Sequence, residues 1–237
     1  MLYMRRETLK QAAPAAPARV RRGYFECRYG QLHLHNAMPP GGGFEEGTAL
    51  LCLHDCPGSG RLFARFLALA GRDRSVYAPD LPGFGESDAP LAAPVLADYA
   101  AALGDFLDNM RLRRLDVLGV RIGALIGAEL ALARASQVGR LVMVAPGAAA
   151  PAESAGAQLP REQRWALEAA AQYPSRERLA RLTQKVLVLK TGDEGADARV
   201  QELPAAARVA QLELPGRELL GAAPERLADS VRDFLRG

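Results

Sequence analysis

Hydrophobic positions along this chain form two kinds of pattern. Short, continuous apolar runs occur at Leu50–Leu53, Val76–Ala78, Leu115–Leu118, Leu141–Val144 and Val186–Leu189. Such runs predict strands that are buried on both faces of a sheet. Between two of them, Val95–Leu107 has apolar residues at helical spacing on one side, namely Leu96, Tyr99, Leu103 and Phe106. Strands that alternate with helices predict an α/β fold with a central, mostly parallel, doubly wound sheet and helices on both faces.

The N-terminal part of the chain has different patterns. The first residues are rich in Ala and Pro, so we expect a disordered or loosely docked arm at 1–22 and a single domain at 23–237. Polar and apolar residues then alternate around Tyr29-Gly30, which predicts a hairpin within Tyr24–His35. His33 and His35 share one face of it, which we expect to be the exposed face of an edge strand. An H-x-H pair can bind metal, but no third ligand is evident, so the sequence predicts no metal site and no cofactor.

The segment from Gly147 to Gln184 contains two short helical patterns split by Tyr173-Pro174-Ser175. The first has Trp165, Leu167 and Ala171, and the second has Leu179 and Leu182. We expect a reduced helical cap at about 148–184. Two interpretations stay open: the helices only cover the sheet, or they contribute to a shallow binding pocket.

Composition narrows the classes of function. The 30 basic and 27 acidic residues nearly balance, with no basic block interleaved with aromatic residues, so we expect no nucleic-acid partner. No run reaches the ~18 apolar residues of a membrane span, so we expect no membrane partner. The three cysteines lack disulfide or metal spacing, which favours a soluble, cytoplasmic protein. A small-molecule ligand and a homo-oligomer are both compatible with this composition.

The most informative stretch runs from Leu115 to Ala135 and is centred on Gly119-Val120-Arg121-Ile122-Gly123. A buried strand that ends in G-x-x-x-G before a helix is typical of a nucleophile elbow, in which a sharp turn pushes the middle residue into a cleft. That residue is normally Ser, Cys or Asp, and here it is Arg121. A guanidinium is always protonated and has no lone pair for attack, so Arg121 cannot begin covalent catalysis.

Four motifs in order carry a family resemblance: HDCPGSG, APDLPGFGESD, LDVLGVRIGALIGAELALA and LVMVAPG. From Gly23 to the C-terminus the chain resembles the α/β-hydrolase superfamily. The resemblance implies an α/β-hydrolase fold and an oxyanion hole made by the amides of Cys56 and Ile122, with Asp55 beside them. It also implies a nucleophile at the elbow, then an acid after a later strand, then a histidine near the C-terminus.

The triad implied by this resemblance is degenerate. All three histidines, His33, His35 and His54, precede the elbow, and the base position falls on or beside Arg217. The acid position falls on Asp193, with Glu194 or Asp197 as alternatives if the loop is shifted. Arg121, Asp193 and Arg217 therefore occupy the positions of nucleophile, acid and base, and we do not expect them to act as a catalytic triad.

Two hypotheses about function follow. The first is a non-hydrolytic pseudoenzyme that binds a small, anionic ligand or a protein partner in the cleft that holds the active site in the family it resembles. The second is an active hydrolase or lyase, acting on a small ester or carboxylate-bearing substrate through a non-standard site. For Arg121, a salt bridge with Asp193 is favoured over an anion site, because burying an unpaired charge is costly. For Cys56, a buried thiol is favoured over a relocated nucleophile, and the family resemblance implies a structural role for His54.

Overall fold

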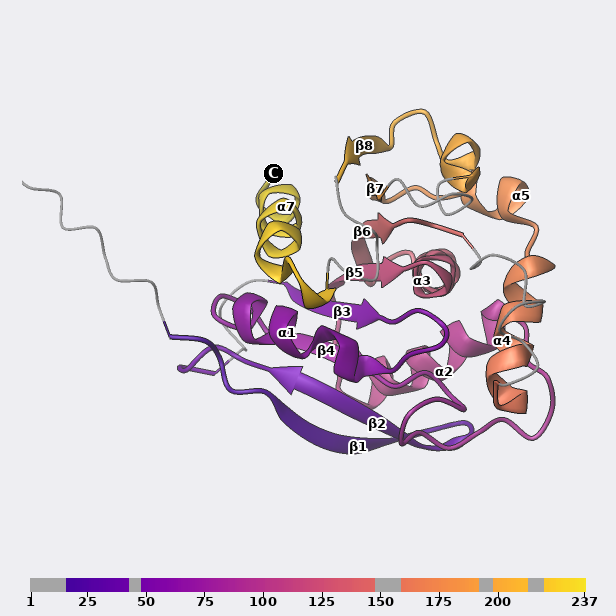
Figure 1. The fold of residues 1–237 in the computed structure, drawn as a ribbon, viewed down its shortest axis with the longest axis horizontal. Helices are drawn as coiled ribbons and strands as arrows, with labels where there is room; N and C mark the ends of the chain where they lie inside the picture. Colours follow the sequence, from indigo (N-terminus) through magenta and orange to yellow (C-terminus); the bar gives the residue numbers. More distant parts are fainter. Residues whose placement is uncertain (1–15, 43–47, 148–158, 192–197, 213–219) are drawn as a thin grey trace, which may run out of the picture.

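Eight strands form one sheet in the order β1-β2-β4-β3-β5-β6-β7-β8 (Figure 1). The computed structural model describes residues 16–42, 48–147, 159–191, 198–212 and 220–237. β2 pairs antiparallel with β1 on one side and with β4 on the other. The remaining pairings, along β4-β3-β5-β6-β7-β8, are all parallel. Their bounds are β1 Arg21–Cys27, β2 Gly30–Ala37, β3 Ala49–Leu53, β4 Val76–Pro79, β5 Leu115–Val120, β6 Val138–Val144, β7 Lys185–Lys190 and β8 Arg208–Gln211.

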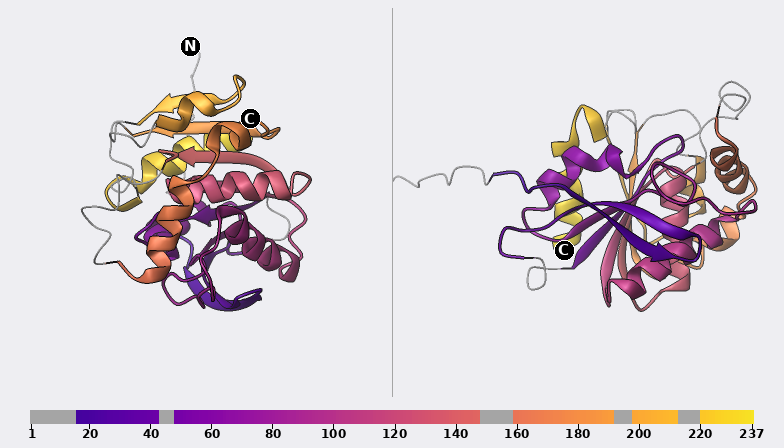
Figure 2. Two further views of the ribbon diagram at one scale, coloured as in Figure 1. Left: turned by 90° about the vertical axis from the view of Figure 1, so that its right-hand side faces the viewer. Right: turned by 90° about the horizontal axis from the view of Figure 1, so that it is seen from below.

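Helices cover both faces of this sheet. Figure 2 shows α1 and α7 on one side of the strands, and α2 and α3 on the other. The short cap helices α4 and α5 lie against α3 and extend the second layer. The helical bounds are η1 Gly60–Phe63, α1 Ala64–Ala70, α2 Leu96–Asn109, α3 Ile122–Ala133, α4 Arg161–Ala171, α5 Ser175–Leu179, η3 Ala198–Glu202 and α7 Pro224–Arg236.

The central strands feed two hydrophobic cores, one on each face of the sheet. In β3, Leu51 and Leu53 pack into the core under α2 and α3, whereas Leu50 and Cys52 pack into the core under α1 and α7. Successive side chains of a strand point to opposite faces, so a strand covered on both sides must be apolar at every position. This explains the continuous apolar runs and confirms the predicted doubly wound α/β sheet.

The elbow turn is held by close packing of backbone on backbone. A methyl group at Gly119 would collide with the backbone of Gly123 and Ala124, and one at Gly123 would collide with the carbonyls of Leu53 and His54. Both glycines are therefore required for α3 to start directly above β5 and beside β3. β5 lies between β3 and β6, so this turn is at the centre of the sheet rather than at its edge.

Some expectations about the termini are corrected. β1 begins at Arg21, and the backbone amide of buried Ala18 donates to the Ala68 carbonyl, so ordered structure starts before the predicted boundary at Gly23. His33 and His35 lie on β2, which is enclosed between β1 and β4. Their predicted exposure on an edge strand is wrong: the two residues are 1% and 9% exposed.

The two cap helices are observed close to where they were predicted, and Pro174 separates them. In the described part of the chain, the strand nearest the C-terminus is β8. Within the described ranges, no helix combines the length and apolar character that crossing a bilayer would need.

Replacement of Gly123 by Ala should destabilise the fold strongly, because the new methyl group meets the carbonyls of Leu53 and His54 rather than a flexible side chain. Overpacking of this kind costs about 1–3 kcal/mol or more. The free energy of unfolding from urea denaturation measures the effect. Gly221→Ala is the matched control, since nothing lies within 4 Å of the position of its added methyl group. Equal stability of the two variants would contradict the packing account.

Candidate functional site

Arg121 occupies the tip of the elbow between β5 and α3. Its backbone has φ 49° and ψ −110°, a conformation that non-glycine residues rarely adopt and that costs about 1–3 kcal/mol. The Arg121 amide donates to the Val144 carbonyl at 2.9 Å, which fixes the turn against β6. The sequence prediction of a sharp turn that presents residue 121 is consistent with this geometry.

The guanidinium of Arg121 is paired with a carboxylate on the neighbouring loop. Its Nε lies 3.6 Å from Oδ2 of Asp55, and the two side chains are 12% and 3% exposed. In the parallel pairing of β3 with β5, Leu53 is level with Gly119. Asp55 and Arg121 each follow two residues later, so the strand register itself places the opposite charges side by side. A buried arginine requires such compensation.

Cys56 follows Asp55 and lies under the cap. The residue is 1% exposed, and its thiol donates to the carbonyl of Gln163 on α4 at 3.5 Å. This is the buried thiol that the sequence favoured. Ile122, whose amide was expected in the oxyanion hole, begins α3 and is 1% exposed.

His54 joins the loop after β3 to the loop after β4. Its Nδ1 donates to the carbonyl of Asp55 at 2.8 Å, and its Nε2 accepts from the amide of Leu81 at 2.9 Å. Burial lowers the pKa of the imidazole to about 4, so the ring is neutral at physiological pH. With both nitrogens used by the backbone, His54 has a structural role and cannot serve as a general base for Cys56.

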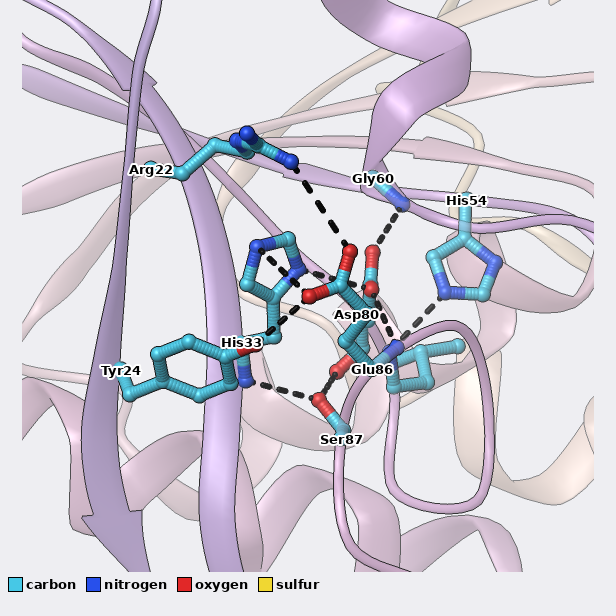
Figure 3. A network of polar contacts seen from close by, with 9 residues as sticks. Arg22, Tyr24, His33, His54, Gly60, Asp80, Glu86 and Ser87 are labelled. Carbon is cyan, nitrogen blue, oxygen red and sulfur yellow. Dashed lines mark hydrogen bonds and ion pairs between the residues drawn. The ribbon is translucent and has the colours of Figure 1, made fainter.

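His33 belongs to the polar network around Asp80 that Figure 3 shows, in which His54 also appears, and the ring of His35 packs edge-on against that of His33. His33 lies on β2, and its Nδ1 is 2.9 Å from Oδ2 of Asp80. β2 is separated from β5 by β4 and β3 in the sheet. Every histidine of the chain is therefore either locked by backbone hydrogen bonds or distant in the sheet from Arg121.

A buried ion pair attaches the cap to α3. Arg178 on α5 donates from Nε and Nη2 to the two carboxylate oxygens of Glu129 at 2.7 and 2.6 Å, and the hydroxyl of Tyr173 donates to the same carboxylate at 2.7 Å. The Glu129 side chain is only 4% exposed. Hydrogen bonding to Glu129 raises the pKa of Arg178, while burial, followed by the Glu129 hydrogen bond, raises that of Tyr173. The cap is thus fixed to the helix that begins at the elbow.

Several predicted site residues lie outside the described ranges. These are the residues proposed for the acid and base positions: Asp193, Glu194, Asp197 and Arg217. Their part in the site stays a prediction. The expected salt bridge of Arg121 with Asp193 falls under the same limit, whereas the pairing with Asp55 was not predicted. The signal for it was present, because Asp55 and Arg121 each follow the end of a buried strand and these strands prove to be neighbours.

The sheet order and the helices on both faces place this chain among the doubly wound α/β proteins. A family model described as alpha/beta hydrolase fold matches residues 48–196. The chain belongs to the α/β-hydrolase fold family.

Sequence relatives match only part of this chain. An uncharacterized protein of Mycobacterium bovis is 30% identical over 101 residues, which cover 43% of this chain and 30% of that protein. The rat protein named 1-acylglycerol-3-phosphate O-acyltransferase ABHD5 is 32% identical over 103 residues, which cover 42% of this chain and 29% of the relative. The matches thus span less than a third of the length of either relative.

Solved structures resemble the whole described fold. A hydrolase from Pseudomonas aeruginosa PA01 has a TM-score of 0.77 at 19% identity, covering 91% of this chain and 98% of that one. The enol-lactonase from Burkholderia xenovorans LB400 has a TM-score of 0.77 at 17% identity, covering 91% of this chain and all (100%) of that one. At these identities the likeness establishes the fold.

Acid should destabilise the protein through His54. Because its folded-state pKa of about 4 is lower than the ordinary 6.5, the stability that it contributes is present above pH 6.5 and is lost as the pH falls toward 4. The loss by pH 4 amounts to ~3 kcal/mol for this residue. Urea denaturation at pH 7 and pH 4 should show a correspondingly smaller loss in His54→Asn, whose side chain does not titrate. Equal losses in the two proteins would refute the assignment.

Proposed function

We propose that this chain is a non-hydrolytic member of the α/β-hydrolase fold family, which binds a small anionic ligand at the elbow instead of performing covalent catalysis. The observation that carries the proposal is the paired guanidinium of Arg121 at the position where the family presents its nucleophile. A cation held against Asp55 supplies charge and hydrogen-bond donors, and it supplies no electron pair for attack.

The surroundings of Arg121 support the loss of acyl-transfer chemistry. A serine or cysteine nucleophile needs a neighbouring base that accepts its proton. His54 is the histidine next to the site in sequence, and its two ring nitrogens are bonded to Asp55 and to Leu81. Cys56 is close to the elbow but is directed at the cap backbone through Gln163. None of these side chains has the geometry of a nucleophile with its base.

The electrostatics of the elbow support an anionic ligand. Arg121 is the N-terminal cap of α3, a helix of 12 residues, so the positive end of the helix dipole and the guanidinium charge coincide. The side chain keeps 12% exposure, and its planar fork suits a carboxylate or a phosphate. Asp55 offsets part of this positive charge, so the affinity should be weak.

Ester hydrolysis should be at background. The loss of a triad member typically costs about 10⁴-fold in rate, and here the nucleophile position itself is changed. A panel of p-nitrophenyl esters on the purified protein, with an active α/β-hydrolase as positive control, measures this. Arg121→Ser should not restore turnover, because His54 remains bonded to the backbone.

The opposite outcome would favour an active enzyme with a non-standard site. Saturable turnover by the natural chain would contradict the proposal. If that turnover were abolished in Cys56→Ala while circular dichroism showed an intact fold, it would assign the nucleophile to Cys56.

Small carboxylates or phosphate should raise the melting temperature. For a ligand at ten times its Kd, linkage gives ~1.4 kcal/mol, or about 3–6 °C for a domain of this size. The shift should disappear in Arg121→Ala and persist in Arg226→Ala, which removes an exposed arginine from α7. Arg217→Ala tests the predicted second cation. A shift that survives in Arg121→Ala would place the anion elsewhere, and no shift with any anion would favour a protein partner or a purely internal salt bridge.

A further inference from the structure

A second cluster of chemically versatile side chains lies between β2 and the loop after β4. Ligand atoms of His33, His35 and Asp80 all lie within 4.8 Å of one another. Glu86 joins them, with its Oε2 4.0 Å from Nε2 of His33 (Figure 3). The sequence alone showed the two histidines and no third ligand, because Asp80 and Glu86 belong to a strand end and a loop more than forty residues later.

Asp80 holds His33 in one orientation. Its Oδ1 accepts from the amide of Gly60 at 2.7 Å, and its Oδ2 accepts from the amide of Glu86 and contacts Nδ1 of His33, both at 2.9 Å. The loop is built around this carboxylate: Gly85 has φ +54°, and a methyl group there would collide with Oδ2. With Nδ1 committed to Asp80, Nε2 is the nitrogen of His33 that faces Glu86.

A buried carboxylate bonded to one ring nitrogen is the usual outer support of a metal-ligating histidine, because it fixes the orientation of the ring. The ring of His35 lies edge-on to that of His33, with centroids 4.8 Å apart. His35, Asp80 and Glu86 line an open pocket of about 600 Å³, which gives an ion access.

We propose that the cluster beside this pocket binds a divalent metal ion of the zinc class through Nε2 of His33, which is buried and does not itself line the pocket, a ring nitrogen of His35 and the carboxylate of Glu86, with Asp80 as the outer carboxylate. Two nitrogens and one carboxylate are ligands that zinc accepts at about 2.0–2.2 Å. Ligand atoms on one tetrahedral ion are then about 3.3 Å apart. The 4.0 Å separation between His33 and Glu86 closes to this value with a small movement of Glu86, whose side chain is 56% exposed.

Two neighbours compete with the metal for Glu86, and a further cation lines the pocket. Nη1 of Arg22 lies 4.0 Å from its Oε1, the hydroxyl of Tyr24 donates to its Oε2 at 2.6 Å, and Arg61 also lines the pocket. The side chain of Arg22 is 67% exposed, so it can turn into solvent when an ion enters. The two arginines balance Asp80 and Glu86 and should weaken binding. Imidazole ligands favour Zn²⁺ and Co²⁺ over Mg²⁺ and Ca²⁺.

The experiment titrates ZnCl₂ into the full chain after removal of metal with EDTA, by calorimetry, with Co²⁺ as a spectroscopic substitute. We expect one ion per chain, visible d–d absorption of Co²⁺ in a site of low coordination number, and no response to Mg²⁺. His35→Gln and Glu86→Gln should weaken zinc binding at least tenfold. Arg22→Ala should tighten it, because a competing cation is removed.

Matched variants separate this site from adventitious binding. Glu225→Gln removes an exposed carboxylate from α7, and Cys27→Ser removes the cysteine that is not fully buried. Both should bind zinc like the natural chain. No binding at micromolar to millimolar zinc, or equal affinity in Glu86→Gln and Glu225→Gln, would overturn the proposal. Since β2 is two strands removed from β5, the result does not depend on the function proposed for Arg121.

Discussion

The close contact between the backbone of α3 and the backbones of β3 and β5 is the constraint on which the site and the cap depend. Gly119 and Gly123 bring the backbone of α3 against the carbonyls that end β3, and a single methyl group at either position would separate them. This contact sets the height of α3, and with it the place of the cap that Glu129 and Arg178 hold. It also forces residue 121 into a positive φ whatever its side chain is.

The same contact determines the chemistry that the turn can carry. In this chain the turn presents a mostly buried cation, and its desolvation must be offset. Asp55 provides that offset at 3.6 Å because parallel strands bring their carboxyl ends to one edge. The chain therefore combines the α/β-hydrolase fold with a charge pair at this turn.

The sequence was informative where structure depends on local pattern. The apolar runs predicted strands β3 to β7 because a strand covered on both faces has no polar positions, and the glycine spacing predicted the turn at Arg121. Prediction was poorer where distant segments meet. His33 and His35 were expected to be exposed because their alternation resembles an edge strand, whereas β2 is enclosed between β1 and β4, and Glu86 from a distant loop lies near His33. Nothing local in the sequence connected them with Asp80. Asp55 and Arg121 each follow a buried strand, but that these two strands are neighbours is a tertiary fact.

The positive φ at Arg121 has a consequence for protein design. The neighbouring glycines and the bond to Val144 hold this conformation, so it depends on the backbone packing of the turn and not on the arginine side chain. The backbone geometry of the turn does not depend on which side chain is present at position 121. A designer who wished to build an esterase on this scaffold would leave the backbone of the turn unchanged, replace the side chains at the tip and on the loop after β3, and supply an imidazole whose nitrogens are not already engaged.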